Sequence, residues 1–201
     1  MKFPIKQVYT VAAENLTGHA SVTGDAWVIG TANAGDGLAH QVTIKNNSVT
    51  DHSAKTIVLT GSDARGNAQT ETLAAPGASA TVTSTKLWGW LNTATPSVTI
   101  GADTFDIGWA AAAVSPWVDL EYYRKDFAVS VAVVASGTIN YDVEHTYDTD
   151  LSGAEPFKHS LLQSKTASDD GQYAYPVTAV RVRVNSHTSG KVAFSVLQGE
   201  R

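Results

Sequence analysis

The segment from residue 138 to residue 147 alternates between two kinds of side chain. Four apolar or aromatic residues and one histidine occupy its odd positions: Ile139, Tyr141, Val143, His145 and Tyr147. Polar residues occupy the even positions between them: Asn140, Asp142, Glu144 and Thr146. Successive side chains of a β-strand point to opposite faces of a sheet, so this period of two predicts a strand with one buried face and one solvent-exposed face.

Three further segments, 127–134, 180–184 and 192–196, repeat the alternation. Ser136-Gly137 supplies turn-forming residues between the first of these and the 138–147 segment, which predicts a hairpin there. We expect the four strands to form one layer of a β-sandwich. Arg181 and Arg183 share one face of their strand, and we expect both side chains to lie in solvent.

The composition favours strands over helices along the whole chain. Charged residues make up only 16% of the 201 residues, and convincing helical periodicity is absent. These features predict an all-β protein of two β-sandwich (jelly-roll-like) units with little helix. The small-residue stretch 110–116 ends in proline and is typical of a link. The expected division is an N-terminal arm or strand at 1–16, a first unit at 17–112 and a second at 113–201, with a single larger jelly-roll body as the alternative.

Several classes of protein are disfavoured by what the sequence lacks. The absence of cysteine excludes disulfides and thiolate metal sites. Residues 1–5 lack the apolar segment of a secretory signal, and no apolar run approaches the roughly 18–20 residues of a membrane helix. We therefore expect a protein made in the cytoplasm that has no membrane partner. The net charge is −5 and there is no basic stripe, so a nucleic-acid partner is not expected either. No cofactor is implied.

The first half of the chain contains a hairpin pattern and a pair of tryptophans. Residues 56–60 and 68–73 flank a connection rich in turn-forming residues and predict an antiparallel hairpin. Trp88 and Trp90 are separated only by Gly89, so both indoles lie on one face if the segment is extended. Two aromatic rings on one strand cover a core or a subunit interface, or they form a stacking platform for a ligand such as a sugar. Trp88 and Trp90 are therefore candidate interface or ligand residues.

A long loop is expected from about residue 148 to residue 175. Its first residues, Asp148, Asp150 and Ser152, place oxygen-bearing side chains at alternate positions, as in the first half of a calcium-binding loop. The twelfth position of such a loop needs a bidentate glutamate and is His159 here, with Glu155 as a nearby substitute. These four residues (Asp148, Asp150, Ser152 and Glu155) form a weak calcium candidate, and an acidic surface loop without metal is the favoured interpretation.

Catalytic patterns are weak. Asp142 and Glu144 share one strand face, and paired carboxylates serve glycoside hydrolysis. Both are expected on the solvent side, where isolated acids are common. The Gly-x-Ser-x-Gly pattern of serine hydrolases is absent, and no histidine spacing matches a zinc site. The sequence therefore predicts no catalytic residues and a protein that is not an enzyme.

Four segments carry a resemblance to known proteins. The run from Ile57 to Thr72 is followed, after a Pro-Gly turn, by Val82 to Lys86. The run from Ser136 to Asp148 is followed by Asp170 to Val182, which includes the unusual sequence Tyr-Ala-Tyr-Pro-Val-Thr-Ala. Together these segments resemble virion structural proteins of tailed bacteriophages, and the second pair is the more specific.

The resemblance implies a non-enzymatic structural subunit of a tailed-phage virion that forms homo-oligomers. Its partners would be other virion proteins (portal, adaptor, tail or major capsid protein), and we expect it in the tail or head–tail connector region. Two alternatives stay open. One is a capsid decoration (cement) protein that stabilises the shell, and the other is a carbohydrate-binding module that recognises host-surface glycans.

Overall fold

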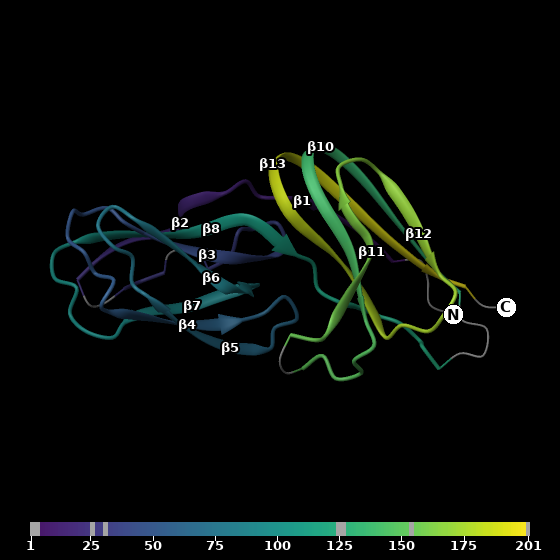
Figure 1. Cartoon of the computed structure of the whole chain (residues 1–201), viewed down its shortest axis with the longest axis horizontal. Helices are drawn as coiled ribbons and strands as arrows, with labels where there is room; N and C mark the ends of the chain where they lie inside the picture. The colour runs from purple at the N-terminus through teal and green to yellow at the C-terminus, as the bar shows by residue number, and fades with distance from the viewer. Residues whose placement is uncertain (1–4, 25–26, 30–31, 124–127, 153–154, 200–201) are drawn as a thin grey trace. The chain divides into compact units, whose positions relative to one another are not determined.

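The computed structural model describes residues 5–24, 27–29, 32–123, 128–152 and 155–199. These residues form strands, turns and loops without a helix, as the sequence predicts. None of them forms a helix of the length and apolarity that crossing a membrane requires. The chain divides into two compact units, a first unit of residues 13–113 and a second unit of residues 1–12 together with 114–201 (Figure 1). Both units are β-sandwich-like.

The first unit is built from two sheets. In the larger one β3 lies between β6 and β8, and β2 pairs with the other edge of β8. In the smaller one β4 lies between β5 and β7. Its strands are β2 (Asn15–Thr23), β3 (Ala39–Asn46), β4 (Thr56–Ser62), β5 (Ala68–Ala74), β6 (Thr81–Trp88), β7 (Trp90–Pro96) and β8 (Thr104–Val114).

The core of the first unit lies between these two sheets. Ile44 and Phe105 from the larger sheet and Leu59 and Leu91 from the smaller one are completely buried in one cluster. The predicted hairpin is confirmed, because β4 and β5 pair antiparallel along their whole length. Apolar residues at alternate positions of β4 face this core, which explains why the sequence pattern identified the strand.

The second unit is organised by two long antiparallel strands, β10 and β13, which curve together (Figure 1). β12 pairs with the first half of β10, and β11 pairs with its second half. Because β13 runs antiparallel to β10, β9 pairs with the start of β13 and β1 pairs with its second half. The strands are β1 (Ile5–Thr10), β9 (Val118–Asp119), β10 (Val129–Thr146), β11 (Lys158–Lys165), β12 (Asp169–Tyr173) and β13 (Ala179–Gln198).

The N-terminal segment contains a strand, and the expected long loop is more ordered than the sequence predicted. The 1–16 segment was expected as a separate arm or strand, and its residues 5–10 form β1, which pairs with β13 inside the second unit. Residues 1–4 lie outside the described residues. The expected loop from residue 148 to residue 175 contains two strands, β11 and β12.

The hairpin predicted at Ser136-Gly137 is wrong. Residues 129–146 form one continuous strand, and Gly137 lies opposite Gly190 of β13 rather than at a chain reversal. Both glycines have positive φ, 80° and 123° respectively. A glycine pair at one level of a ladder lets both strands bend there without a steric clash. The turn-forming residues therefore bend a strand pair instead of ending a strand.

The odd face of β10 is buried, as the alternation predicted. Tyr141, Val143 and His145 are each 4% exposed or less. The prediction for the even face is wrong at Glu144, which is also only 4% exposed. The prediction for Arg181 fails in the same way, since this residue is 2% exposed. β10 and β13 are central strands, and other parts of the chain cover their second face.

The buried charges are paired. The Nε atom of Arg181 donates to Oε2 of Glu144 over 2.7 Å, and a second guanidinium nitrogen donates to Glu155. The ring of Trp117 covers the guanidinium, with 4.3 Å between the Arg181 Cζ atom and the ring centroid. Burial alone would raise the pKa of Glu155, but the charge and the hydrogen bond of Arg181 outweigh it and hold that pKa below its ordinary value. Arg181 thus ties the loop before β11 to the centre of the second unit.

Candidate functional site

Four exposed rings form the most distinctive surface of the second unit. We call Tyr147, Phe157, His159 and Tyr175 the aromatic surface. The side chain of Phe157 is 73% exposed, and Tyr147 and Tyr175 are each about half exposed. Phe157 and His159 lie 5.0 Å apart between ring centroids, and Tyr147 and His159 lie 5.7 Å apart. A cluster of exposed aromatic rings is the kind of surface that proteins use for association.

Strand register brings these rings together. His145 of β10 is directly opposite His159 of β11, and their rings stack with centroids 5.5 Å apart. Tyr147 is two residues beyond His145, and Phe157 is two residues before His159, so the period of two keeps them on the same face. Tyr175 follows β12 and contributes the last ring, 6.5 Å from His145.

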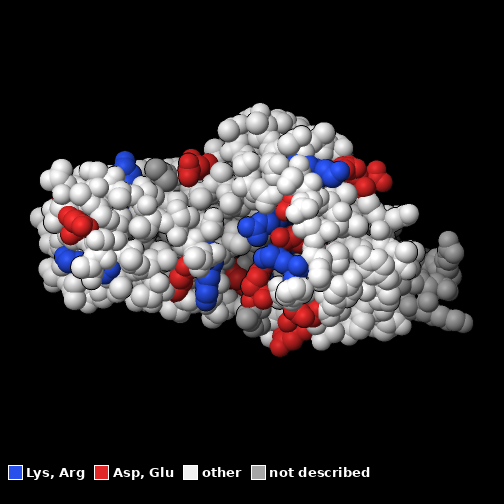
Figure 2. All heavy atoms as spheres, viewed as in Figure 1, with Lys and Arg blue, Asp and Glu red and all other residues white. Residues whose placement is uncertain are grey.

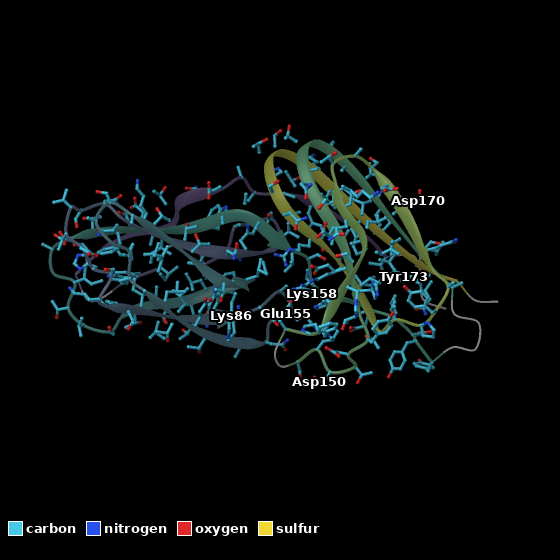
Figure 3. All side chains as sticks on the ribbon, in the orientation of Figure 1. Lys86, Asp150, Glu155, Lys158, Asp170 and Tyr173 are labelled. Carbon is cyan, nitrogen blue, oxygen red and sulfur yellow. The ribbon has the colours of Figure 1, made fainter. Side chains whose placement is uncertain are left out.

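Beneath the aromatic surface lie two buried polar rings, His145 and Tyr173. Their centroids are 5.1 Å apart, and Figure 3 places Tyr173 on β12. Among the described residues, neither Nδ1 of His145 nor the hydroxyl of Tyr173 has a hydrogen-bond partner. Burial, and then the neighbouring His159, lower the pKa of His145 below the ordinary histidine value. Burial likewise raises the pKa of Tyr173. Both rings are therefore held neutral near pH 7.

The low pKa of His145 predicts a specific loss of stability in mild acid. In the unfolded chain His145 takes up a proton near its ordinary pKa of about 6.5, whereas the folded chain resists that proton. The unfolded state then binds more protons, so the free energy of unfolding falls as the pH drops below about 6.5. A His145→Phe variant keeps a ring of similar shape, and it should lose less stability between pH 7 and pH 5.5. Urea unfolding at both pH values measures this.

Four rings are packed against His145, and they affect the stability of both the wild type and the His145→Phe variant. They are His159, Tyr147, Tyr173 and Tyr175, and His159 is the one other imidazole among them. All four are retained in the variant, so the difference between the two proteins isolates His145. Equal losses of stability in both proteins would contradict the assignment.

The two tryptophans predicted to share a face are separated by the structure. Trp88 ends β6 in the larger sheet and is 3% exposed, whereas Trp90 begins β7 in the smaller sheet and is 50% exposed. Gly89 between them forms a bend, and its amide donates to the carbonyl of Ser62 over 2.9 Å. The two rings therefore do not share a stacking platform, which was one of the two alternatives for them. Trp88 is a core residue, and Trp90 alone is accessible.

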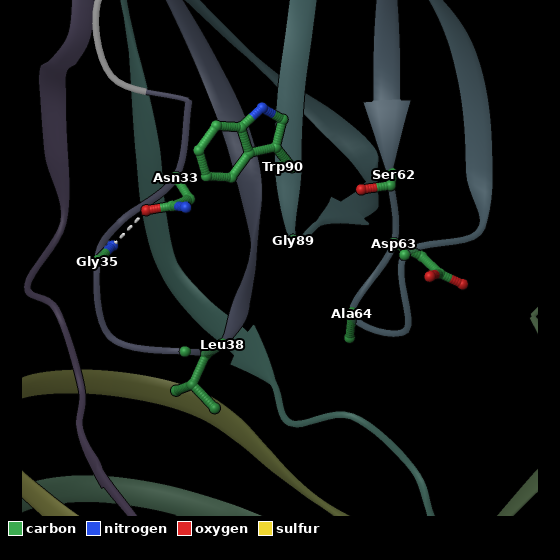
Figure 4. A pocket seen from close by; sticks show the side chains of 10 residues that line it. Asn33, Gly35, Leu38, Ser62, Asp63, Ala64, Gly89 and Trp90 are labelled. Atoms are coloured by element: carbon green, nitrogen blue, oxygen red, sulfur yellow. Dashed lines mark hydrogen bonds between the residues drawn. The ribbon is translucent and has the colours of Figure 1, made fainter.

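A pocket of about 480 Å³ opens beside Trp90 in the first unit (Figure 4). It lies between the segment 33–38, the turn 62–66 and the bend at Gly89. The indole of Trp90 extends toward the first of these segments in the close-up. The lining residues are Asn33, Gly35, Gly37, Leu38, Ser62, Asp63, Ala64, Gly66, Gly89 and Trp90.

The calcium candidate residues do not converge. Oδ2 of Asp148 accepts the amide of Phe157, and Oδ1 of Asp150 accepts both the amide and the hydroxyl of Ser152. Glu155 pairs with Arg181 and, over 3.0 Å, with Lys158, which lies close to it in Figure 3. Within the part of the chain that the structure describes, no three acidic or histidine side chains form a group able to hold a metal ion. The carboxylates of Asp148, Asp150 and Glu155 instead hold the loop in place through these hydrogen bonds and ion pairs.

The carboxylate pair considered for glycoside hydrolysis has structural partners. Glu144 is buried against Arg181, and Oδ1 of Asp142 accepts the amide of Ser164 over 2.6 Å. The face drawn in Figure 2 carries acidic and basic side chains close together on a mostly uncharged surface. Glu144 serves as the counter-ion of a buried arginine, which sequence spacing did not reveal because Arg181 belongs to a different strand.

The amino-acid sequence does not reveal the aromatic surface, because its rings come from separate segments of the chain. Tyr147 and His159 are far apart in the chain, and only the pairing of β10 with β11 joins them. The alternation of β10 placed His145 and Tyr147 on one face, and this was the one available signal.

No protein-family model matches this chain, and neither the curated proteins nor the solved structures contain a significant match to it.

Proposed function

We propose that this chain is a non-enzymatic structural subunit of a tailed-phage virion and that it assembles with other virion proteins in the tail or head–tail region. The observation that carries the proposal is the aromatic surface. Its exposed rings come from the segments 136–148 and 170–182, which bear the stronger resemblance to phage virion proteins, and from the loop and strand between them.

The physical character of this surface supports an assembly role. Aromatic side chains lose little conformational entropy when they are buried, and they are enriched at the centres of protein interfaces. Tyr147 directly follows β10, Phe157 directly precedes β11, His159 lies on β11 and Tyr175 follows β12. These three strands are hydrogen-bonded into one unit. Rings attached to hydrogen-bonded strands need less ordering when they bind a neighbouring subunit than rings on an unstructured segment would.

Replacing the three exposed carbocyclic rings tests the proposal. The variant Tyr147→Ala, Phe157→Ala, Tyr175→Ala should keep its unfolding free energy within about 1 kcal/mol of wild type, since exposed side chains contribute little to stability. Its incorporation into particles should fall at least tenfold, because interface anchors of this type contribute about 2 kcal/mol or more each. Gradient-purified particles from a complemented deletion phage, assayed by quantitative mass spectrometry, give the incorporated amount.

A matched control uses exposed apolar residues elsewhere in the second unit. Val134 and Leu197 are 62% and 51% exposed, and a Val134→Ser, Leu197→Ser variant should incorporate normally. Wild-type incorporation of the aromatic variant would overturn the proposal. If the chain copurifies with capsid shells rather than with tails or connectors, the decoration alternative replaces the proposed location.

A further inference from the structure

The pocket beside Trp90 belongs to the first unit and shares no residue with the aromatic surface. Its volume of about 480 Å³ falls within the roughly 300–1,000 Å³ typical of small-molecule sites. An accessible indole forms one wall, and such a ring offers a flat apolar face on which a ligand can stack.

The walls of the pocket are preformed. The amide of Leu91 donates to the carbonyl of Ala32 over 2.7 Å, which fastens the segment before Asn33 to β7. A Cβ atom at Gly89 would lie 2.4 Å from the carbonyl oxygen of Asp63, so only glycine allows the turn and the bend to approach this closely. Both contacts fix the walls on either side of Trp90.

The loop before β3 is also held in place. Buried His40 bridges two partners, with Nδ1 lying 2.8 Å from the carbonyl of Ala110 and Nε2 lying 2.9 Å from Oδ2 of Asp36. The amide of Leu38 donates to Oδ1 of Asp36 over 2.9 Å. Hydrogen bonds therefore hold the segment that faces the indole in place, which lowers the entropy lost on binding.

The unused polar groups of the lining are neutral. The amide nitrogen of Asn33, the hydroxyl of Ser62 and the indole nitrogen of Trp90 have no hydrogen-bond partner among the described residues. Among the described lining residues Asp63 alone is charged, and its carboxylate already accepts the amides of Arg65 and Asn67 and the side-chain amide of Asn67. None of the described residues that line the pocket is a lysine or an arginine. A phosphorylated or sulfated ligand would find no counter-ion there.

We infer that this pocket binds a neutral sugar unit, with one face of the sugar ring stacked on Trp90. Sugars combine an apolar C–H face with peripheral hydroxyls, which matches one exposed aromatic wall surrounded by neutral donors and acceptors. Gly35 and Gly66 present open space where a Cβ atom would stand, so a ligand can approach the backbone at these positions. The assignment gives the chain a glycan-binding function beyond its proposed structural role.

The test uses an array of immobilised neutral oligosaccharides built from glucose, galactose, mannose and N-acetylhexosamines. Titration calorimetry with the best binder then gives affinities. Trp90→Ala should weaken binding at least tenfold, Trp90→Phe should stay within about threefold because the ring is kept, and Ser62→Ala should weaken binding several-fold. Circular dichroism confirms that each variant is folded, and Trp90→Phe keeps the test valid if Trp90→Ala unfolds.

Phe157→Ala is the matched control, because it removes an exposed ring outside the pocket. It should leave sugar binding unchanged, and Trp90→Ala should leave particle incorporation unchanged, so the two functions can fail separately. The inference is overturned if no neutral sugar binds the wild-type protein at millimolar concentration, if binding is restricted to phosphorylated or sulfated glycans, or if folded Trp90→Ala binds as tightly as wild type.

Discussion

Arg181→Ala is expected to destabilise the second unit by about 3–5 kcal/mol, because it leaves the buried carboxylate of Glu144 without a counter-ion. The side chains of Arg181 and Glu144 are 2% and 5% exposed, so water cannot replace the lost partner. The variant also removes the cation from the face of Trp117 and frees Glu155 from its main partner. Urea unfolding, with hydrogen exchange of β10 amides as a probe of the second unit, measures the loss.

Arg183 provides the matched control for this prediction. Its Nη1 atom lies 3.7 Å from Oε1 of Glu144, but its side chain is 32% exposed. Partly exposed ion pairs contribute about 0–1 kcal/mol, so Arg183→Ala should have a small effect. The double variant Arg181→Met, Glu144→Leu should recover much of the stability, because it removes both buried charges together. Equal losses in the two arginine variants would contradict a specific role for Arg181.

Gly190→Ala is the second change expected to have a large effect. A Cβ atom at this position would lie 1.8 Å from the carbonyl oxygen of Ser136, and φ is 123°, a conformation that residues with a side chain rarely adopt. Neither backbone can move without breaking the pairing of β10 with β13. We expect the free energy of unfolding to fall by about 3 kcal/mol or more, read by thermal and urea unfolding.

Variants of two other glycines separate the two causes of the destabilisation expected for Gly190→Ala, the steric clash and the backbone strain. Gly101 has φ of 84° with open space around its Cβ position, so Gly101→Ala reports the backbone strain alone, about 1–2 kcal/mol. Gly199 has open space and no positive φ, so Gly199→Ala should be close to neutral. If Gly190→Ala costs no more than Gly101→Ala, the close approach of β10 and β13 at the bend is not as described.

Alternation in the sequence predicted the strands and their inward faces, because that signal is local. It located the buried residues Tyr141 and Val143 and the hairpin between β4 and β5. It failed at Glu144 and Arg181, since the outer face of these strands is covered by Trp117 and by the loop that carries Glu155. When distant segments cover the outer face of a strand, the alternation of apolar and polar residues in that strand does not show it.

Glycine positions were the other source of error. Ser136-Gly137 has the composition of a turn, but its conformation depends on the opposite glycine of β13, which local sequence does not reveal. Gly89 likewise allows a bend that sends Trp88 and Trp90 into different sheets. The pocket beside Trp90 follows from that bend together with the turn after β4. Neither could be predicted from the spacing of the two tryptophans.

Cryo-electron microscopy of intact particles tests the proposed structural role most directly. The account predicts density for this chain in a ring near the portal or along the tail, with the aromatic surface of Tyr147, Phe157, His159 and Tyr175 buried against a neighbouring subunit. Density over the capsid lattice would move the chain to a decoration role. Particles without density for this chain, or with the aromatic surface facing solvent, would contradict the account.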